Sequence, residues 1–153
     1  MKIGQKLKNI KLTVDNNTVL TEKELTGKKV IIYFYPKDDT PGCTTEAIDF
    51  TSFKKKFEKL NVSIIGVSKD SILKHSKFIQ KHNLKIELAA DEDGSLCEMF
   101  GVWIEKSMYG KKYMGIERST FLFDENLSLI YVWKKVKVKN HVQEVFDHIS
   151  NLS

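Results

Sequence analysis

Two mostly apolar runs separated by a helix-length segment most constrain how this chain can fold. Residues 30–36 read VIIYFYP and residues 62–67 read VSIIGV, as is typical of strands buried on both faces of a sheet. Between them, four apolar residues recur at spacings of three, four and three: Phe50, Phe53, Phe57 and Leu60. This spacing predicts one face of a helix that begins near Cys43. The order strand, helix, strand predicts a crossover unit with parallel strands.

The remaining patterns predict further elements along the chain. They are a helix over 71–82, a short strand over 88–90, a short helix from 93 to 100 that ends at Gly101, strands over 119–124 and 127–133, and a last helix through 149. Residues Glu125 and Asn126 would turn the last two strands into a hairpin, and Asn140 would cap the last helix. We therefore expect an α/β protein of the thioredoxin-like kind, with a mixed central β-sheet flanked by helices.

Length and composition predict one globular domain over residues 1–153, because this length buries enough surface without disulfide bonds. The net charge of +5 comes from basic residues that are spread along the chain, so we expect no nucleic-acid partner. No apolar stretch approaches the roughly 18 residues of a membrane span, and we expect no membrane association. The basic start lacks the apolar core of a secretory signal, which with only two cysteines favours the cytoplasm.

One of the two cysteines, Cys43, directly follows a Thr-Pro-Gly turn at the expected start of a helix. Its polar neighbours in the sequence predict an exposed side chain. Unpaired N–H groups and the helix dipole stabilise a negative charge at such a position. Thiols placed in this way are often reactive thiolates, so the position predicts a redox or nucleophilic role.

The loop before Cys43 carries residues that suit a small binding site. The hydroxyl of Thr40 can point at the same space as the sulfur, Pro36 and Pro41 stiffen the loop, and Gly42 permits close backbone approach. Spacing alone leaves an equal alternative, in which this is an ordinary strand-to-helix loop with turn residues and a capping threonine.

Taken together, several motifs resemble one family. The pattern Pro36-x-x-x-Thr40-x-x-Cys43 is similar to the peroxiredoxin active-site motif, and its setting resembles the peroxiredoxin Q or bacterioferritin comigratory protein branch. The resemblance extends over nearly the whole chain, through GVSKDS (66–71), HSKFIQKHNL (75–84), DEDG before FGVW (100–103) and RSTFLFDENL (118–127).

This resemblance implies a thiol-dependent peroxidase that reduces hydrogen peroxide and organic hydroperoxides. Cys43 would attack the peroxide and become a sulfenic acid, Thr40 would hydrogen-bond the peroxide, Pro36 would shield the sulfenic acid, and Arg118 would stabilise the thiolate and the transition state. A thiol such as thioredoxin, glutaredoxin or glutathione would reset the enzyme, and no metal or other cofactor is implied. The family favours a monomer.

The chain departs from this branch at the second thiol. Many relatives carry a resolving cysteine five residues after the first, but here that position is Ile48. The other cysteine, Cys97, is either a resolving cysteine or a buried small side chain, and burial is favoured because free cysteine is among the most buried residue types. Glu46 either orients Arg118 through a bidentate ion pair or only complements the helix start.

Other candidate residues have ordinary explanations. Trp103 could line the pocket, although core packing is favoured, and His75, His82, His141 and His148 are expected at the surface or its boundary. Two other function classes remain. A non-catalytic thioredoxin-like binding protein or redox-sensing chaperone would need none of the four site residues, and a dithiol oxidoreductase would need a cysteine at position 46, which is Glu46.

Overall fold

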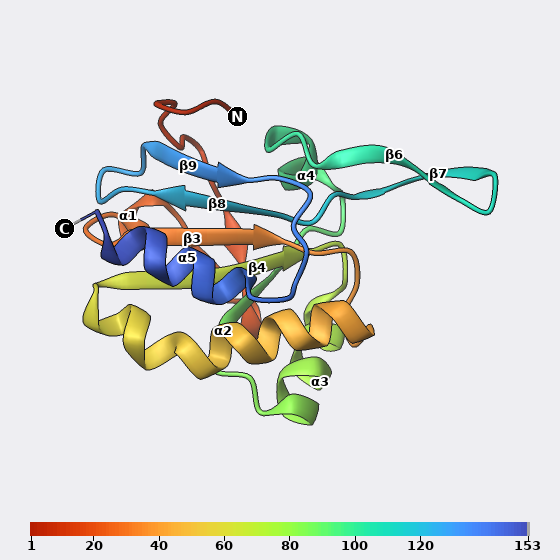
Figure 1. The fold of residues 1–153 in the computed structure, drawn as a ribbon, viewed down its shortest axis with the longest axis horizontal. Coiled ribbons are helices and arrows are strands. Elements are labelled where there is room, and N and C mark those ends of the chain that lie inside the picture. The colour runs from red at the N-terminus through yellow and green to blue at the C-terminus, as the bar shows by residue number, and fades with distance from the viewer. Residues whose placement is uncertain (153) are drawn as a thin grey trace.

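A seven-stranded mixed sheet forms the centre of the computed structural model, which describes residues 1–152 (Figure 1). Its strand order is β2-β1-β5-β4-β3-β8-β9, and a separate two-stranded sheet pairs β6 with β7. The strands are β1 (Leu12–Thr13), β2 (Val19–Leu20), β3 (Lys29–Phe34), β4 (Val62–Ser68), β5 (Glu87–Ala90), β6 (Trp103–Met108), β7 (Lys111–Ile116), β8 (Ser119–Phe123) and β9 (Leu129–Trp133). The helices are the short 3-10 helix η1 (Asp15–Asn17), α1 (Glu22–Leu25), α2 (Pro41–Lys59), α3 (Ile72–His82), α4 (Ser95–Met99) and α5 (His141–Ser150).

The predicted crossover unit is present as β3, α2 and β4. The two strands pair in parallel, with Ile31 opposite Ile64 and Phe34 opposite Val67. β8 pairs antiparallel with β3 on its other side, so the sheet is mixed as the sequence predicts. The active-site loop therefore leaves the carboxyl end of a central strand, where loops of parallel strands commonly carry binding residues.

Side chains that alternate along β3 separate the core into two layers. Val30, Ile32 and Phe34 belong to one cluster, to which α4 contributes Leu96 and Cys97. Ile31, Tyr33 and Tyr35 belong to the other, which α2, α3 and α5 cover and which includes Cys43. The two cysteines thus face opposite layers of the same sheet.

The N-terminal elements and the β6–β7 hairpin are absent from the sequence prediction. β1 and β2 have two residues each, which is too short for a periodic pattern. The hairpin strands are mostly exposed, so no buried face marks them, and the hairpin projects away from the sheet in Figure 1. Its turn is nevertheless typical, because Tyr109 and Gly110 both have positive φ.

Two local predictions near the C-terminus need correction. The link between β8 and β9 runs from 124 to 128 rather than over two residues, and Asp124 Oδ1 accepts hydrogen bonds from the N–H groups of Asn126 and Ser128. Asn140 occupies the N-cap position of α5, but it has a left-handed conformation and its side chain makes no capping hydrogen bond. Among residues 1–152, none of the helices combines the length and apolar character that crossing a bilayer requires.

Candidate active site

Cys43 is the third residue of α2, in the first turn after Pro41. The N–H groups of Gly42 and Cys43 have no carbonyl to pair with inside the helix, because they precede its first complete turn. The side chain is 2% exposed, so the predicted exposed cysteine is wrong. Its sequence neighbours are polar because they form the turn, whereas the third helical position faces the sheet and packs with Tyr33 and Ala47.

Arg118, just before β8, reaches the sulfur from the far side of the site. Its Nη2 donates to Cys43 Sγ at 3.4 Å, and its Nη1 donates to Glu46 Oε1 at 2.7 Å. Although burial lowers it, the pKa of Arg118 is raised above its ordinary value by the charges of Glu46 and Cys43. One guanidinium therefore connects the thiol to a carboxylate one turn further along α2.

Glu46 is fully buried, and only one of its oxygens is paired. Oε2 has no hydrogen-bond partner among residues 1–152, so Glu46 contacts Arg118 through one oxygen and not through the bidentate pair of the first of the two alternatives. Burial raises the pKa of Glu46 to about 7, and Arg118 limits the rise. The carboxyl therefore changes its protonation near neutral pH.

Three residues of the loop and the helix start, Pro36, Thr40 and Gly42, differ in what they contact near Cys43 and Arg118. Thr40 is the N-cap residue of α2, and its hydroxyl donates to the Lys37 carbonyl at 2.9 Å, while its oxygen accepts no capping hydrogen bond from the helix. A Cβ at Gly42 would lie 3.3 Å from Arg118 Nη2, so glycine leaves room for the guanidinium. Pro36 lies exposed at the rim.

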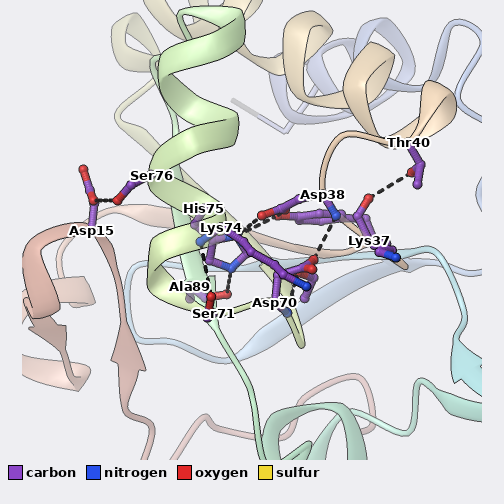
Figure 2. A network of polar contacts seen from close by, with 12 residues as sticks. Asp15, Lys37, Asp38, Thr40, Asp70, Ser71, Lys74, His75, Ser76 and Ala89 are labelled. Atoms are coloured by element: carbon purple, nitrogen blue, oxygen red, sulfur yellow. Dashed lines mark hydrogen bonds and ion pairs between the residues drawn. The ribbon is translucent and has the colours of Figure 1, made fainter.

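A buried polar network, which the sequence did not predict, ties this loop to α3 (Figure 2). Asp38 Oδ2 lies 2.6 Å from Nδ1 of His75, and the Tyr35 hydroxyl donates to Asp38 Oδ1 at 2.5 Å. His75 Nε2 lies 2.9 Å from the Ala89 carbonyl oxygen. Both ring nitrogens of His75 therefore have hydrogen-bond partners, one in the loop and one in β5.

A second loop aspartate holds the outer side of α3. Asp39 accepts from Lys81 Nζ at 2.7 Å and lies 2.8 Å from His82 Nε2. Hydrogen bonds from Lys81 and His82 lower the pKa of Asp39 below its ordinary value. His75 and His82 are seven residues apart, which places them on one face of α3 two turns apart, toward consecutive aspartates of the loop.

The comparisons with known proteins agree with one another. Residues 3–132 match the AhpC/TSA family. The chain is 48% identical over 153 residues to peroxiredoxin Bcp of Bacillus subtilis, covering 100% of this chain and 98% of the relative. A cysteine-to-serine variant of Xylella fastidiosa PrxQ superposes with a TM-score of 0.94 at 37% identity, covering 99% of this chain and 97% of the other. The bacterioferritin comigratory protein of Xanthomonas campestris gives a TM-score of 0.89 at 40% identity, covering 94% and 92%.

The chain belongs to the AhpC/TSA family. It is a peroxiredoxin of the Q or bacterioferritin comigratory protein type, and thus a thiol-dependent peroxidase. The recognition of the branch from its motifs and the thioredoxin-like fold are both confirmed.

Cys97, the second thiol of this peroxiredoxin, packs in a different core layer from Cys43. Cys97 is fully buried in α4, as the favoured alternative predicted. Burial and the carboxylate of Asp91 raise the pKa of the Cys97 thiol well above its ordinary value. Asp91 also accepts from the backbone N–H groups of Leu96 and Cys97, at 3.0 and 2.9 Å, which holds the first turn of α4 in place.

The other candidates divide between core and surface. His75 and His141 are buried, so the expected surface or boundary position is wrong for these two. His141 accepts from or donates to Thr120 Oγ1 across 2.8 Å. Trp103 is half-buried against the core layer of Cys97, as favoured, but it also lines a surface cavity. Within the described residues no cluster of histidine, cysteine and acidic side chains could hold a metal ion.

Proposed function

We propose that Cys43 is the peroxidatic cysteine of this enzyme. Its thiolate would attack one oxygen of the peroxide, the O–O bond would break, and the products would be a sulfenic acid on Cys43 and water or an alcohol. The single observation that carries this assignment is the contact of Arg118 Nη2 with Cys43 Sγ at 3.4 Å in the first turn of α2. A fixed cation and a helix start both favour the thiolate.

The surrounding groups would stabilise the departing oxygen. The leaving oxygen gains negative charge as the O–O bond breaks, and fixed donors in a site with little water stabilise such a charge. Arg118 and the unpaired N–H groups at the start of α2 supply these donors, and Thr40 joins them when its hydroxyl turns from the Lys37 carbonyl. Glu46 orients Arg118 by their contact at 2.7 Å, and Pro36 shields the sulfenic acid from the rim.

The substrates would be hydrogen peroxide and organic hydroperoxides. Cys43 is buried, which suits a peroxide group that enters while the rest of the molecule stays outside. Structures of the Xanthomonas campestris relative concern its alkyl peroxide reduction activity, and the identity of 40% between the two chains supports a similar substrate range here.

An external thiol would reset the sulfenic acid. Cys97 belongs to the opposite core layer from Cys43, which favours a one-cysteine cycle over a resolving role for Cys97. The first thiol would form a mixed disulfide and release water, and a second would restore the Cys43 thiolate. Thioredoxin, glutaredoxin and glutathione are the candidate donors, and two free cysteines favour a reducing compartment such as the cytoplasm. We expect a monomer.

Loss of the thiolate tests the assignment directly. The Cys43→Ser variant should keep the wild-type circular dichroism spectrum and melting temperature but lose peroxide consumption, because a serine hydroxyl is not ionised at neutral pH. The assay follows hydrogen peroxide and an alkyl hydroperoxide with a thiol donor in excess. Wild-type turnover by this variant would overturn the assignment, and an inactive wild type that binds other proteins would favour the non-catalytic alternative.

A further inference from the structure

A surface cavity of about 590 Å³ opens beside Pro36, next to the candidate active site. Three segments form its walls: the start of the active-site loop, the link between β4 and α3, and the β6–β7 hairpin. Its floor is partly apolar, with Trp103, Met114 and Ile116. The volume lies within the range of roughly 300–1,000 Å³ that is typical of small-molecule sites.

In the described part of the chain, the lysines around this cavity are not paired with acidic side chains. Four lysines line it: Lys37, Lys69, Lys74 and Lys106. Within residues 1–152 none of the four forms an ion pair, and Lys69 instead lies 4.2 Å from the centre of the Trp103 ring.

The two carboxylates of the wall do not balance these lysines. Asp70 and Glu92 are the two acidic residues beside four lysines, and Asp70 accepts from the Asp38 N–H at 2.8 Å and from the Ser68 hydroxyl at 2.7 Å. The lining therefore carries an excess of positive charge, and such a concave surface raises the local concentration of anions.

The cavity and Cys43 are electrostatically connected through Lys106. Burial lowers the pKa of Lys106, the charge of Arg118 lowers it further, and the negative charge of Cys43 acts in the opposite direction. Lys106 therefore lies within range of both groups while it lines the cavity. A molecule held there lies among the lysines and beside Pro36, the first residue of the motif that ends at Cys43.

We propose that this cavity binds the carboxylate end of a small anionic thiol and presents its sulfur to the oxidised Cys43. The inference rests on the proposed function, in which the sulfenic acid has no partner thiol in the chain. Hydrogen peroxide needs no such cavity, because it is far smaller, and a simple alkyl hydroperoxide has no anionic group for the lysines. A peptide-sized thiol of the glutathione kind has carboxylates for the lysines and an aliphatic part for Trp103.

The chemistry requires two molecules of this thiol. In the first step its sulfur bonds to the Cys43 sulfur, the S–O bond breaks, and the hydroxyl leaves as water with the thiol proton. In the second step another thiol attacks the sulfur of the bound thiol, the mixed disulfide breaks, and Cys43 returns as a thiolate. Two thiols are oxidised to one disulfide while the sulfenic acid is reduced.

Thiols of different charge test the proposal. The protein is first oxidised with one equivalent of hydrogen peroxide, and its reduction is then followed by stopped-flow fluorescence and mass spectrometry with glutathione, 3-mercaptopropionate, 2-mercaptoethanol and cysteamine. Each rate is divided by the rate of the same thiol with a small uncharged disulfide, which removes differences in intrinsic reactivity. We expect the two anionic thiols to be favoured by roughly tenfold, as one charge contact to the half-buried Lys69 and one to the exposed Lys74 would supply together, and the preference to fall with salt.

Matched variants locate the preference. The double variant Lys69→Met with Lys74→Gln should abolish the preference for anionic thiols. Its rate of Cys43 oxidation by hydrogen peroxide should stay within twofold of wild type. The control, Lys55→Gln with Lys59→Gln, removes the same charge from an exposed part of α2 and should keep it. Equal normalised rates for all four thiols in the wild type, or a preference that survives in the Lys69 and Lys74 variant, would overturn the proposal.

Two further outcomes distinguish failure of this proposal from failure of the proposed function. If the variant slows oxidation by a carboxylate-bearing hydroperoxide but not reduction by glutathione, the cavity serves the oxidant and the proposal is wrong. If hydrogen peroxide does not oxidise Cys43 at all, the proposed function fails before the thiol step is reached.

Discussion

Cys43 and Cys97 face opposite sides of the central sheet, so the backbone of that sheet lies between the two thiols. Cys43 packs in the layer of Ile31 and Tyr33, and Cys97 packs in the layer of Val30 and Ile32. A disulfide requires Cα atoms within about 7 Å and side chains that point toward one another. Side chains that pack in opposite layers do not point toward one another, so we expect a Cys43–Cys97 disulfide to require α4 or the start of α2 to rearrange.

The first prediction concerns the Cys97→Ala variant. Because alanine is small and apolar, it should preserve the buried site, and we expect nearly unchanged peroxide turnover with glutathione, glutaredoxin or thioredoxin as the donor. Peptide mapping of the peroxide-treated wild type should find no intramolecular disulfide. At high peroxide, Cys43 should instead pass to the sulfinic acid, since nothing in the chain traps the sulfenic acid.

A resolving role for Cys97 would give a different and recognisable result. A Cys43–Cys97 disulfide in the oxidised wild type, together with loss of thioredoxin-driven turnover in the Cys97→Ala variant, would make this a two-cysteine enzyme. A Cys97→Ser variant serves as the comparison for packing, because it buries a hydroxyl at the same position.

Arg118 should speed the oxidation of Cys43 more through the geometry of its guanidinium than through its charge alone. Loss of one positioned donor costs about 10²–10³ in rate, so Arg118→Ala should slow the oxidation of Cys43 by this order in stopped-flow measurements. Arg118→Lys keeps a cation but cannot contact both Cys43 and Glu46 with a planar fork, and we expect it to recover only part of the loss. Oxidation of both variants at nearly the wild-type rate would remove Arg118 from the mechanism.

Glu46 should make the stability of the protein depend on pH near neutrality. Its folded pKa of about 7 lies above the ordinary value of 4.5, so the folded state binds a proton more tightly than the unfolded state. The stability from this group is therefore fully present below about pH 4.5 and is lost as the pH rises through about 7. In Glu46→Gln, which has no such proton, that loss should be absent.

The measurement is the difference in unfolding free energy between wild type and Glu46→Gln at a series of pH values. Other groups titrate in both proteins, including His141, whose pKa burial and Arg118 lower to about 4, and their effects cancel in the difference. We expect the wild type to lose stability relative to the variant as the pH rises from 5 to 8, a window set by Glu46. A constant difference over this range would show that Glu46 does not titrate there.

The sequence predicts those parts of the molecule in which one residue pattern decides the structure. The β3 and β4 runs are mostly apolar, and α2 carries its aromatic residues at helical spacing, so these elements and the position of Cys43 were predictable. The exposure of Cys43 was not, because its polar neighbours describe the turn and not the direction of the third helical side chain. The single-oxygen contact of Glu46 likewise depends on where Arg118 arrives from a distant strand.

The contacts of Asp38 with His75 and of Asp39 with His82, which together form a tether between the loop and α3, were partly indicated by the sequence. Two histidines seven residues apart share a helix face, and two consecutive aspartates stand in the loop after β3. What the sequence lacks is the long-range pairing, which places Asp38 against His75 and Asp39 against His82. The spacing excluded a shared metal site, but it was equally consistent with two separate ion pairs.

The last prediction tests whether this tether positions the active-site loop. His75 and Asp38 form a buried pair with side-chain exposures of 0% and 6%. His75→Gln removes the ring nitrogen that contacts the buried Asp38 carboxyl, and leaving a buried polar group unpaired costs about 1–3 kcal/mol of stability. Because Asp38 lies between Pro36 and Thr40, we also expect slower oxidation of Cys43 under conditions in which the variant remains folded.

A neutral pair and an exposed pair provide the controls. His75→Gln with Asp38→Asn replaces both members by neutral amides and should recover part of the stability and part of the peroxide rate. His82→Gln breaks the more exposed contact to Asp39, with side-chain exposures of 21% and 42%, and should change stability much less than His75→Gln does. If the double variant regains stability but not the rate, the native contact between Asp38 and His75 positions the loop for catalysis. If His75→Gln alone reacts with peroxide at the wild-type rate, the tether stabilises the fold without positioning the site.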